Sequence, residues 1–414
     1  MRQNIKFGIG FIAGRPNVCN IINKYYKYIL EQVKEINKKV NFTFFILYDT
    51  AYLNSNEEEF YQILPEVYEE IDIKHITSED IENNKKEIVE IYHVTEEQAS
   101  LLIGRGYAKS RNTILYEAIK KDIDYLLFWD DDEYPLASVK GGGIIEWIKQ
   151  KNVLQHLKYI ENADITFGYR CGMINPLPYV QFNDTLTKDV YKDFVEALEN
   201  DAVSWDRIQF NYKNDSGIGF ADKAVAEYEK EVIQLEDLKK EPLFGSGMCL
   251  NLRHIDKIPA FYNPPNARGE DTFFSCALAN LDAKILKIPV YHFHDAYLKF
   301  QFLMDEKFPK RLRKVVSDDN GVKSRFLKTT SGWIKYKPLL YYINDRENYR
   351  QVMDESKEKL QRSAEKVSTA FNECDLSNLA TLLEEYDKNV EKHYNEYIQT
   401  NEIWNKIKNK IITE

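Results

Sequence analysis

The sequence predicts an α/β protein whose sheet begins with parallel strands joined by crossover helices. Short apolar runs of strand length alternate with amphipathic helical stretches in the first part of the chain. This order of strand, helix and strand builds a parallel sheet. Later the sequence becomes polar and keeps a helical period. We therefore expect an α/β unit at residues 1–300 and a mainly helical extension at residues 301–414.

The amino-terminal elements have the clearest patterns. Continuous apolar runs indicate buried strands, and apolar residues at three-to-four spacing indicate helices that pack on the sheet. A glycine and a proline mark the turn after the first strand. The expected elements are strands at residues 5–12, 42–48, 71–76 and 125–129, and helices at residues 21–36 and 108–119.

The next part of the chain has weaker signals. Three consecutive glycines at residues 141–143 indicate a flexible break before an amphipathic segment at residues 144–157. We expect strands at residues 165–169 and 283–293, with a polar mixture of helix and loop between them.

The composition excludes several classes of protein. The chain has 414 residues, 43% of them hydrophobic, which is enough for a large core. Its net charge of −10 argues against a general nucleic-acid binder. Five scattered cysteines without a CxxC pair fit neither a disulfide framework nor a thiolate zinc site. Without a signal-peptide pattern or a membrane-spanning run, we expect a cytoplasmic protein, soluble or attached to a membrane surface.

A run of carboxylates directly after the apolar strand at residues 125–129 is the strongest candidate site. Asp130, Asp131, Asp132 and Glu133 lie at the carboxyl end of that strand, the edge at which ligands bind in open α/β sheets. Hard oxygen ligands favour Mg²⁺ or Mn²⁺. A solvated acidic turn is the alternative. Strand alternation turns Asp130 and Asp132 towards the site and leaves Asp131 as a structural acid.

Three further motifs carry chemistry. Arg111 begins a helix, where an arginine can bind a phosphate or orient a carboxylate, or simply tie the helix to a core acid. Glu270 and Asp271 begin another helix, as a general base or as a plain acidic cap. His292 and His294 end a strand on one side of it, so that both can reach one cation unless backbone carbonyls satisfy them.

Taken in order, these motifs resemble those of inverting, family-2-type glycosyltransferases of GT-A fold. The resemblance covers residues 5–297 and implies a Rossmann-like, mixed, mostly parallel sheet flanked by helices. It also implies a nucleotide-sugar-binding half at residues 1–135 and an acceptor half at residues 136–300. The residues that carry it are Ser110-Arg111-Asn112, Asp130-Asp131-Asp132, Glu270-Asp271 and His292-Phe293-His294.

The resemblance implies transfer of a sugar from a nucleotide diphosphate to a hydroxyl of a glycan, a lipid-linked acceptor or a small molecule, with Mn²⁺ or Mg²⁺. Asp132 and Asp130 would bind the cation, with His294 and then His292 as further ligands. Asp271 would be the base, with Glu270 beside it, and the loop at residues 245–248 would line the acceptor side. The candidate contacts of the nucleotide sugar are Ala13, Arg15, Asp49, Arg111, Asp130 and Asp131.

Several alternatives stay open. A retaining GT-A glycosyltransferase shares most of these motifs, and strand-end acids also serve nucleotidyltransferases and phosphohydrolases. A non-catalytic scaffold is the third hypothesis. The basic segment at residues 307–337 can dock on anionic lipid, hold a phosphate-bearing acceptor, or form a solvated helical face. The final helices can pack internally or join two copies of the chain.

Overall fold

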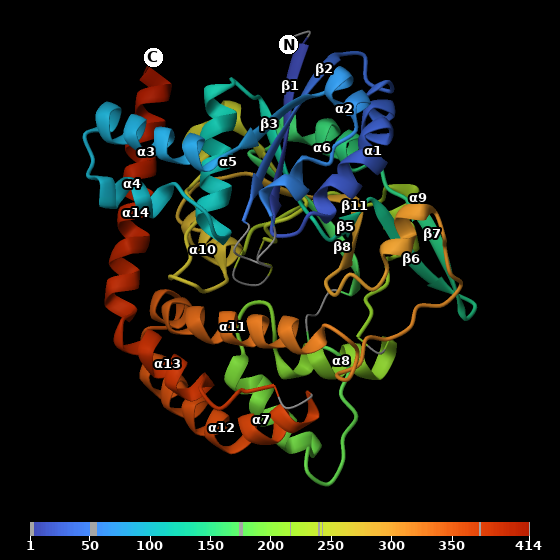
Figure 1. The fold of residues 1–414 in the computed structure, drawn as a ribbon, viewed down its shortest axis with the longest axis vertical. Coiled ribbons are helices and arrows are strands. Elements are labelled where there is room, and N and C mark those ends of the chain that lie inside the picture. Colours follow the sequence, from blue (N-terminus) through green and yellow to red (C-terminus); the bar gives the residue numbers. More distant parts are fainter. Residues whose placement is uncertain are drawn as a thin grey trace.

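A computed structural model describes residues 4–49, 56–173, 177–215, 217–238, 241, 243–371 and 374–413. An α/β part holds the sheet and its covering helices, and a layer of helices lies across one end of it (Figure 1). The expected α/β class is confirmed, as is the helical carboxyl-terminal region.

A nine-stranded mixed sheet forms the centre of the α/β part, with the order β3-β2-β1-β4-β10-β8-β11-β5 and with β9 paired to β11. Four pairings are parallel and four are antiparallel, so the sheet is less parallel than expected. The strands are β1 (Asn4–Ala13), β2 (Lys39–Tyr48), β3 (Asp72–Ile76), β4 (Tyr125–Asp130), β5 (Glu133–Tyr134), β8 (Ile165–Met173), β9 (Ile233–Gln234), β10 (Met248–Asn251) and β11 (Ile285–Asp295).

The chain changes direction across the sheet between β1 and β4. It runs outward from β1 to β2 and β3, then returns to pair β4 with the other side of β1. Both neighbours of β1 are parallel to it. The carboxyl ends of β1 and β4 therefore diverge at a topological switch point, the position where open α/β sheets bind ligands.

Alternating side chains of β4 pack into different cores on the two faces of the sheet. Tyr125, Leu127 and Trp129 join the core under α1, whereas Leu126 and Phe128 join the core under α5. Because both faces are covered, the strand is apolar throughout, as parallel strands usually are. The helices around the sheet are α1 (Asn17–Val33), α2 (Pro65–Glu70), α3 (Ser78–Tyr92), α4 (Glu96–Leu102), α5 (Tyr107–Lys120), α6 (Asn152–Tyr159), α9 (Lys223–Tyr228) and α10 (Glu270–Leu278).

The segment expected as one amphipathic stretch at residues 144–157 is divided instead. Its first part is β7 (Ile144–Lys149), which forms a hairpin with β6 (Leu136–Gly141), and its second part belongs to α6. Gly142 and Gly143 both have positive φ, at 57° and 82°. Two such residues make the tight turn whose twist suits a hairpin, so the glycines connect paired strands.

The helical layer combines two parts of the chain that are distant in sequence. α7 (Lys188–Leu198) and α8 (Trp205–Asp215) lie with α11 (Val322–Asn344), α12 (Tyr349–Ala370) and α13 (Leu379–Lys388). The last helix, α14 (Val390–Thr413), leaves this layer and runs along the side of the α/β part (Figure 1). Its Ile403, Trp404 and Ile407 enter the core beside α4 and α5.

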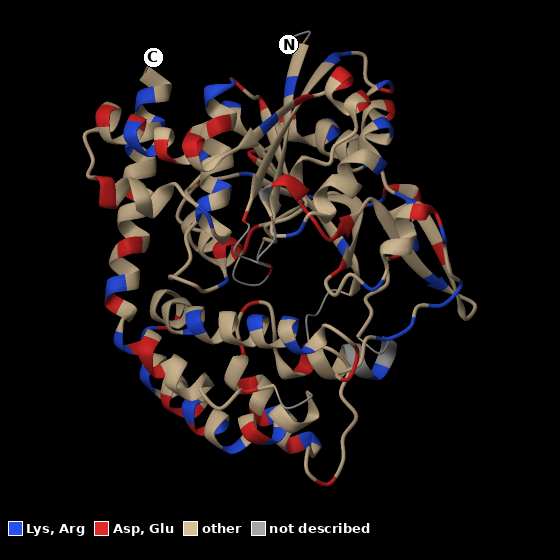
Figure 2. Cartoon of the chain, in the orientation of Figure 1, with Lys and Arg blue, Asp and Glu red and all other residues tan. Residues whose placement is uncertain are grey.

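The basic segment at residues 307–337 does not form one surface. Arg313 is 80% exposed, whereas Lys337 is buried and donates hydrogen bonds to the carbonyl oxygens of Glu196 and Ala197. Figure 2 shows how its Lys and Arg residues are distributed along α11 and the segment that precedes it. Within the described ranges, none of the helices combines the length and apolar character needed to cross a bilayer.

Candidate active site

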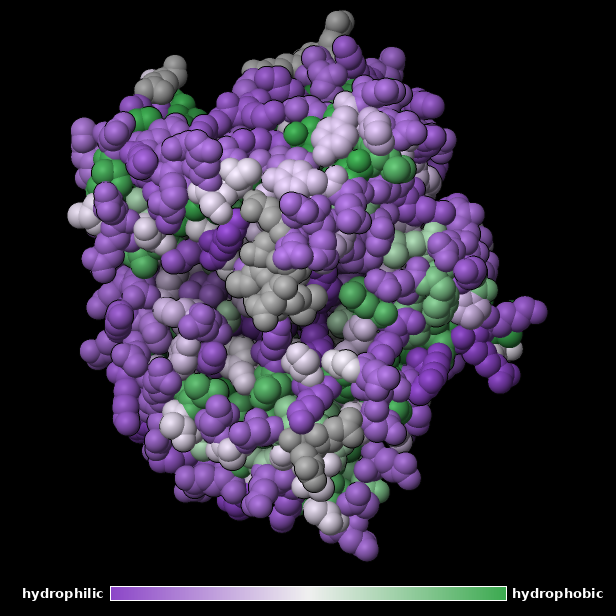
Figure 3. Space-filling model, viewed as in Figure 1, coloured by the Kyte–Doolittle hydropathy of each residue, from purple (hydrophilic) through white to green (hydrophobic). Residues whose placement is uncertain are grey.

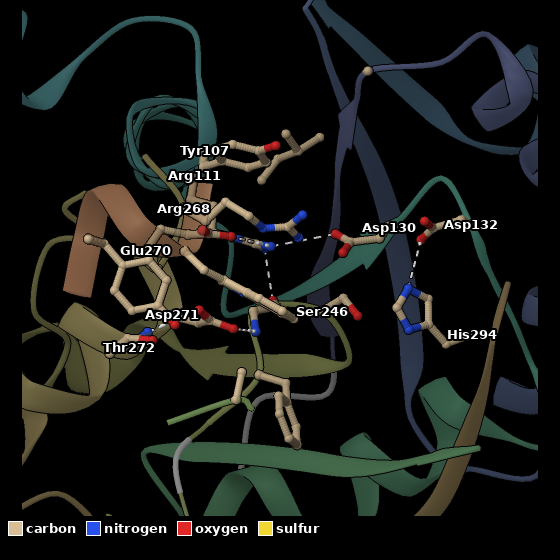
Figure 4. A pocket seen from close by; sticks show the side chains of 18 of the residues that line it. Tyr107, Arg111, Asp130, Asp132, Ser246, Arg268, Glu270, Asp271, Thr272 and His294 are labelled. Atoms are coloured by element: carbon tan, nitrogen blue, oxygen red, sulfur yellow. Dashed lines mark hydrogen bonds and ion pairs between the residues drawn. The ribbon is translucent and has the colours of Figure 1, made fainter. Parts of the chain in front are cut away.

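A cavity of about 700 Å³, here called the main cavity, opens at the carboxyl ends of β1 and β4. The β10 loop and the start of α10 form a second wall, and α8 and α11 of the helical layer close it from below. Six arginines and eight carboxylates line it, so its lining is strongly charged. Figure 4 shows part of this lining from close by.

Asp131 fixes the loop after β1. Its Oδ2 accepts hydrogen bonds from the backbone N–H groups of Gly14 and Arg15, at 3.0 and 2.9 Å, and its Oδ1 accepts one from the Arg15 guanidinium at 2.8 Å. Asn17 at the start of α1 donates to the Asp131 carbonyl oxygen. Asp131 therefore holds the β1 loop against the β4 loop, as expected of a structural acid.

Asp132 lines the main cavity and is surrounded by basic side chains. Its Oδ2 accepts a hydrogen bond from Arg15 at 2.9 Å and lies 3.9 Å from the Arg325 guanidinium, and its Oδ1 is 3.7 Å from His294 Nε2. Although burial raises the pKa of Asp132, Arg15, His294 and Arg325 together hold it well below its ordinary value. Asp132 is therefore an anion at neutral pH.

The side chains near Asp132 are suited to part of a divalent-cation site, in which a bound ligand would supply the remaining coordinating atoms. Asp132 Oδ1 and His294 Nε2 face each other, and Asp130, whose side chain is 33% exposed, adds a carboxylate to the same cavity. In the part of the chain that the structure describes, no three His, Cys, Asp or Glu side chains are arranged to hold a metal. Mg²⁺ is usually held by one or two carboxylates together with substrate phosphates, and Asp130 and Asp132 would supply those carboxylates here.

His292 lies outside the lining of the main cavity, although it is two residues from His294 on the same strand. Its ring packs edge-on against Trp129, and its Nδ1 is 3.6 Å from Glu133 Oε2. Burial lowers the pKa of His292 to about 3, which keeps the ring neutral. Gly247 passes so close that a Cβ there would lie 2.9 Å from His292 Nε2. The two histidines therefore occupy different surroundings.

Arg111 connects three segments around the cavity. Its guanidinium donates to the Gly245 carbonyl oxygen at 2.8 Å and lies 3.5 Å from both Asp130 Oδ1 and Glu270 Oε1. Its side chain is only 4% exposed, and a Cβ on Gly245 would come within 2.5 Å of it. Arg111 thus orients carboxylates rather than standing free for a phosphate.

Glu270 and Asp271 form the first turn of α10 (Figure 4). They lie across the main cavity from the carboxylates at the end of β4, here called the β4 acids: Asp130, Asp131 and Asp132. Gly269 caps the helix at φ 93°, which favours glycine. Burial and the neighbouring Asp271 raise the pKa of Glu270, despite Arg111 and Arg268. The Asp271 oxygens accept N–H groups from Gly245 at 3.2 Å and Thr272 at 3.0 Å. Asp271 is thereby fixed with its carboxylate at the cavity.

A half-buried acid from the α7–α8 connection, Asp201, lies behind Asp271. Asp201 accepts hydrogen bonds from Thr272 Oγ1 at 2.6 Å and from the Tyr336 hydroxyl at 2.8 Å. Burial and then Asp271 raise its pKa. The Tyr336 ring also packs on Gly269, so α11 supports the start of α10 directly.

Most of the residues expected at the site line one cavity. Arg15, Asp49, Arg111, the three β4 acids, both α10 acids and His294 contribute to it, as do Gly245 and Ser246, whereas Ala13 and His292 do not. Sequence reasoning missed Arg170, whose guanidinium donates to Ser246 Oγ at 3.1 Å, because nothing local distinguishes it. It also missed a stripe on α11, which spacing would have indicated: Arg325, Trp333 and Tyr336.

The fold and the site define a mixed α/β protein with a charged ligand cavity at the switch point of its sheet. A scan against models of known protein families finds no match, and no curated protein matches the sequence either. The function of this protein therefore has to be inferred from the chemistry of the site itself.

Proposed function

We propose that this protein is a glycosyltransferase that moves a sugar from a nucleoside diphosphate to an acceptor hydroxyl, with Mn²⁺ or Mg²⁺. The main support is one arrangement: Asp132 and His294 on one side of the main cavity and Asp271 on another side (Figure 4). Cavities of this size typically hold one small-molecule ligand. Both partners of a transfer reaction can meet there.

Several residues favour departure of the diphosphate. Asp132, Asp130 and His294 would hold the divalent cation, which supplies Lewis-acid neutralisation of the leaving charge when it is bound. The chain adds positive charge of its own through Arg15, Arg170 and Arg325, all of which line the cavity. Pre-positioned cations in a partly enclosed site stabilise developing negative charge without reorganisation.

Asp271 is the proposed general base. The acceptor hydroxyl gives its proton to an Asp271 oxygen while its own oxygen forms the new bond to the anomeric carbon. The bond from that carbon to the diphosphate breaks, and the nucleoside diphosphate leaves with the electron pair. Hydrogen bonds from Gly245 and Thr272 fix the carboxylate, which favours a defined attack angle. Attack opposite the leaving group inverts the anomeric centre.

Calorimetric titration with UDP, GDP and CDP tests the proposal. We expect one nucleotide to bind in the presence of Mn²⁺ or Mg²⁺, with binding lost after chelation and in Asp132→Ala. Asp305→Ala, at an exposed carboxylate away from the cavity, is the matched control and should bind normally. Absence of metal-dependent binding across the three nucleotides would contradict the proposal.

The second candidate is a nucleotidyltransferase or phosphohydrolase, favoured by the arginines gathered around Asp132. Incubation with the bound nucleotide's sugar conjugate and metal separates the two. Transfer of the sugar supports the first candidate, and release of inorganic phosphate or pyrophosphate supports the second. The anomeric configuration of the product then distinguishes inversion from retention.

A further inference from the structure

A second cavity, of about 720 Å³, adjoins the main cavity. It lies between the start of α5, the loop before α10 and one face of α11, and α14 contributes Glu396 to its wall. Asp49, Gly106, Tyr107 and Arg268 line both cavities. The second cavity is thus large enough for a ligand of its own and shares part of its wall with the main one.

The charge of the second cavity is strongly positive, in a chain whose net charge is −10. Its lining contains five basic side chains and two carboxylates, Asp49 and Glu396. The basic residues are Arg105, Lys109, Arg268, Lys328 and Lys335. A concave surface with this excess of positive charge concentrates anions.

One face of α11 presents the lower wall of this cavity. Lys328, Ser331, Gly332 and Lys335 all line it, and their spacing of three and four residues places them on one stripe of the helix. Gly332 allows Arg268 to approach, since a Cβ there would lie 2.5 Å from Arg268 Cγ. The stripe therefore brings two lysines and a hydroxyl to the same concave surface as the loop arginine.

Two of the lysines have ammonium groups without a direct hydrogen-bond or ion-pair partner among the described residues, with Glu396 acting on Lys109 and Glu385 on Lys335 only at longer range. Neither the Lys109 nor the Lys335 ammonium group makes a hydrogen bond or ion pair within the ranges the structure describes. Burial lowers the pKa of both. Beside the start of α5, Arg105 has a buried Nε without a hydrogen-bond partner among the described residues. A bound anion would supply the missing partners.

We propose that the second cavity binds a phosphate-bearing ligand, through Lys109 and Arg105 on one wall and Lys328 and Lys335 on the other. Lysine ammonium groups bind phosphate as point charges, and an arginine adds directed N–H donors. The proposal does not require the main cavity to be a glycosyltransferase site.

Titration with inorganic pyrophosphate in EDTA tests this site apart from the metal-dependent one. We expect wild-type protein to bind the probe, with affinity falling as salt is added. Lys109→Gln/Lys335→Gln should weaken binding at least tenfold and keep metal-dependent nucleotide binding. Lys323→Gln is the matched control, because Lys323 is an exposed lysine of α11 outside the cavity. Asp132→Asn should show the reverse pattern, losing nucleotide and keeping pyrophosphate.

Two results would overturn the proposal. One is wild-type protein that does not bind millimolar pyrophosphate, and the other is a double lysine variant that is folded by circular dichroism yet binds within twofold of wild type. Sedimentation with phosphatidylglycerol vesicles identifies the source of the phosphate. Vesicle binding that the double variant loses assigns a lipid headgroup, and pyrophosphate binding without vesicle binding assigns a soluble phosphorylated ligand.

Discussion

Asp271 is held by two backbone N–H groups while its carboxylate lines the main cavity. In Asp271→Asn the side chain keeps its shape but loses the proton acceptor. We expect turnover to fall about 100-fold or more, because general-base catalysis contributes on that order. Nucleotide affinity should stay within a few-fold, because the β4 acids are untouched. Steady-state kinetics and calorimetry measure the two effects.

Asp305→Asn is the control for this change, since Asp305 is an exposed aspartate outside the cavity. It should keep wild-type turnover. The amide of Asp271→Asn keeps only one oxygen, so it can replace only one of the two hydrogen bonds that the carboxylate accepts. The thermal stability of the variant must therefore be measured together with its kinetics. An equal loss of turnover and affinity in Asp271→Asn would assign Asp271 a structural role instead.

Single residues were predictable from the sequence where strand order determines their neighbours. The β4 acids follow the end of a strand, and the α10 acids begin a helix. They meet because both of these element ends lie at one edge of the sheet. Arg170 reaches the same cavity through tertiary packing of β8, which no local pattern encodes, whereas the spacing of Arg325 and Trp333 on α11 would have indicated a shared face. His292 was expected beside its neighbour, but packing against Trp129 and Gly247 holds it outside the cavity.

Among the elements, α11 carries a buried lysine, Lys337, that faces α7. Burial lowers the pKa of Lys337 to about 7, partly offset by Glu199 and Glu355 and reinforced by Lys359. The unfolded chain holds this proton up to about pH 10.5, whereas the folded chain releases it near pH 7. The unfolded state therefore binds more protons across that window, and folding stability rises with pH through it.

Lys337→Met removes this titration and keeps most of the buried volume. We expect the wild-type urea midpoint to rise relative to that of Lys337→Met when the pH increases from neutral by about two units. Chemical denaturation of both proteins at each pH measures the difference. Parallel pH profiles for the two proteins would show that Lys337 keeps an ordinary pKa.

The elements themselves show why boundaries are harder to predict than types. The strands β1, β2 and β4 occur where expected. Both faces of the sheet are covered there, so these strands are apolar along most of their length, and continuous apolar runs mark them in the sequence. The segment at residues 144–157 contains apolar residues that suit either period, so only the pairing of β6 with β7 distinguishes strand from helix. That pairing depends on the positive φ angles of Gly142 and Gly143. Glycine permits such angles, but the amino-acid sequence alone does not show that these two residues adopt them.

At the scale of the whole molecule, the carboxyl-terminal helices are part of the core. Trp404 is fully buried and donates a hydrogen bond to the Ile258 carbonyl oxygen, and Tyr336 supports the start of α10. The sequence indicated a helical extension but not this packing. An amphipathic stripe shows which face of a helix is buried but does not show which element covers that face. On the face seen in Figure 3, hydrophilic residues predominate, and hydrophobic residues gather below and to the right of the hollow between the two parts.

Removal of residues 301–414 is therefore expected to prevent folding. The truncated chain would expose the apolar surfaces that α11 and α14 cover, and we expect neither cooperative urea unfolding nor nucleotide binding. Removal of residues 412–414 alone is the control and should leave both intact, because Ile412 and Thr413 are exposed. A residues 1–300 fragment that unfolds cooperatively would show that the α/β part is an independent domain.

The position of α14 also has a consequence for synthesis on the ribosome. Domains usually begin to fold as they emerge, from the amino terminus onward. Here the apolar surface of α4 and of residues 252–257 is covered in part by α14, through Ile403, Trp404 and Ile407. That surface therefore stays incompletely covered until residues 403–407 have left the exit tunnel.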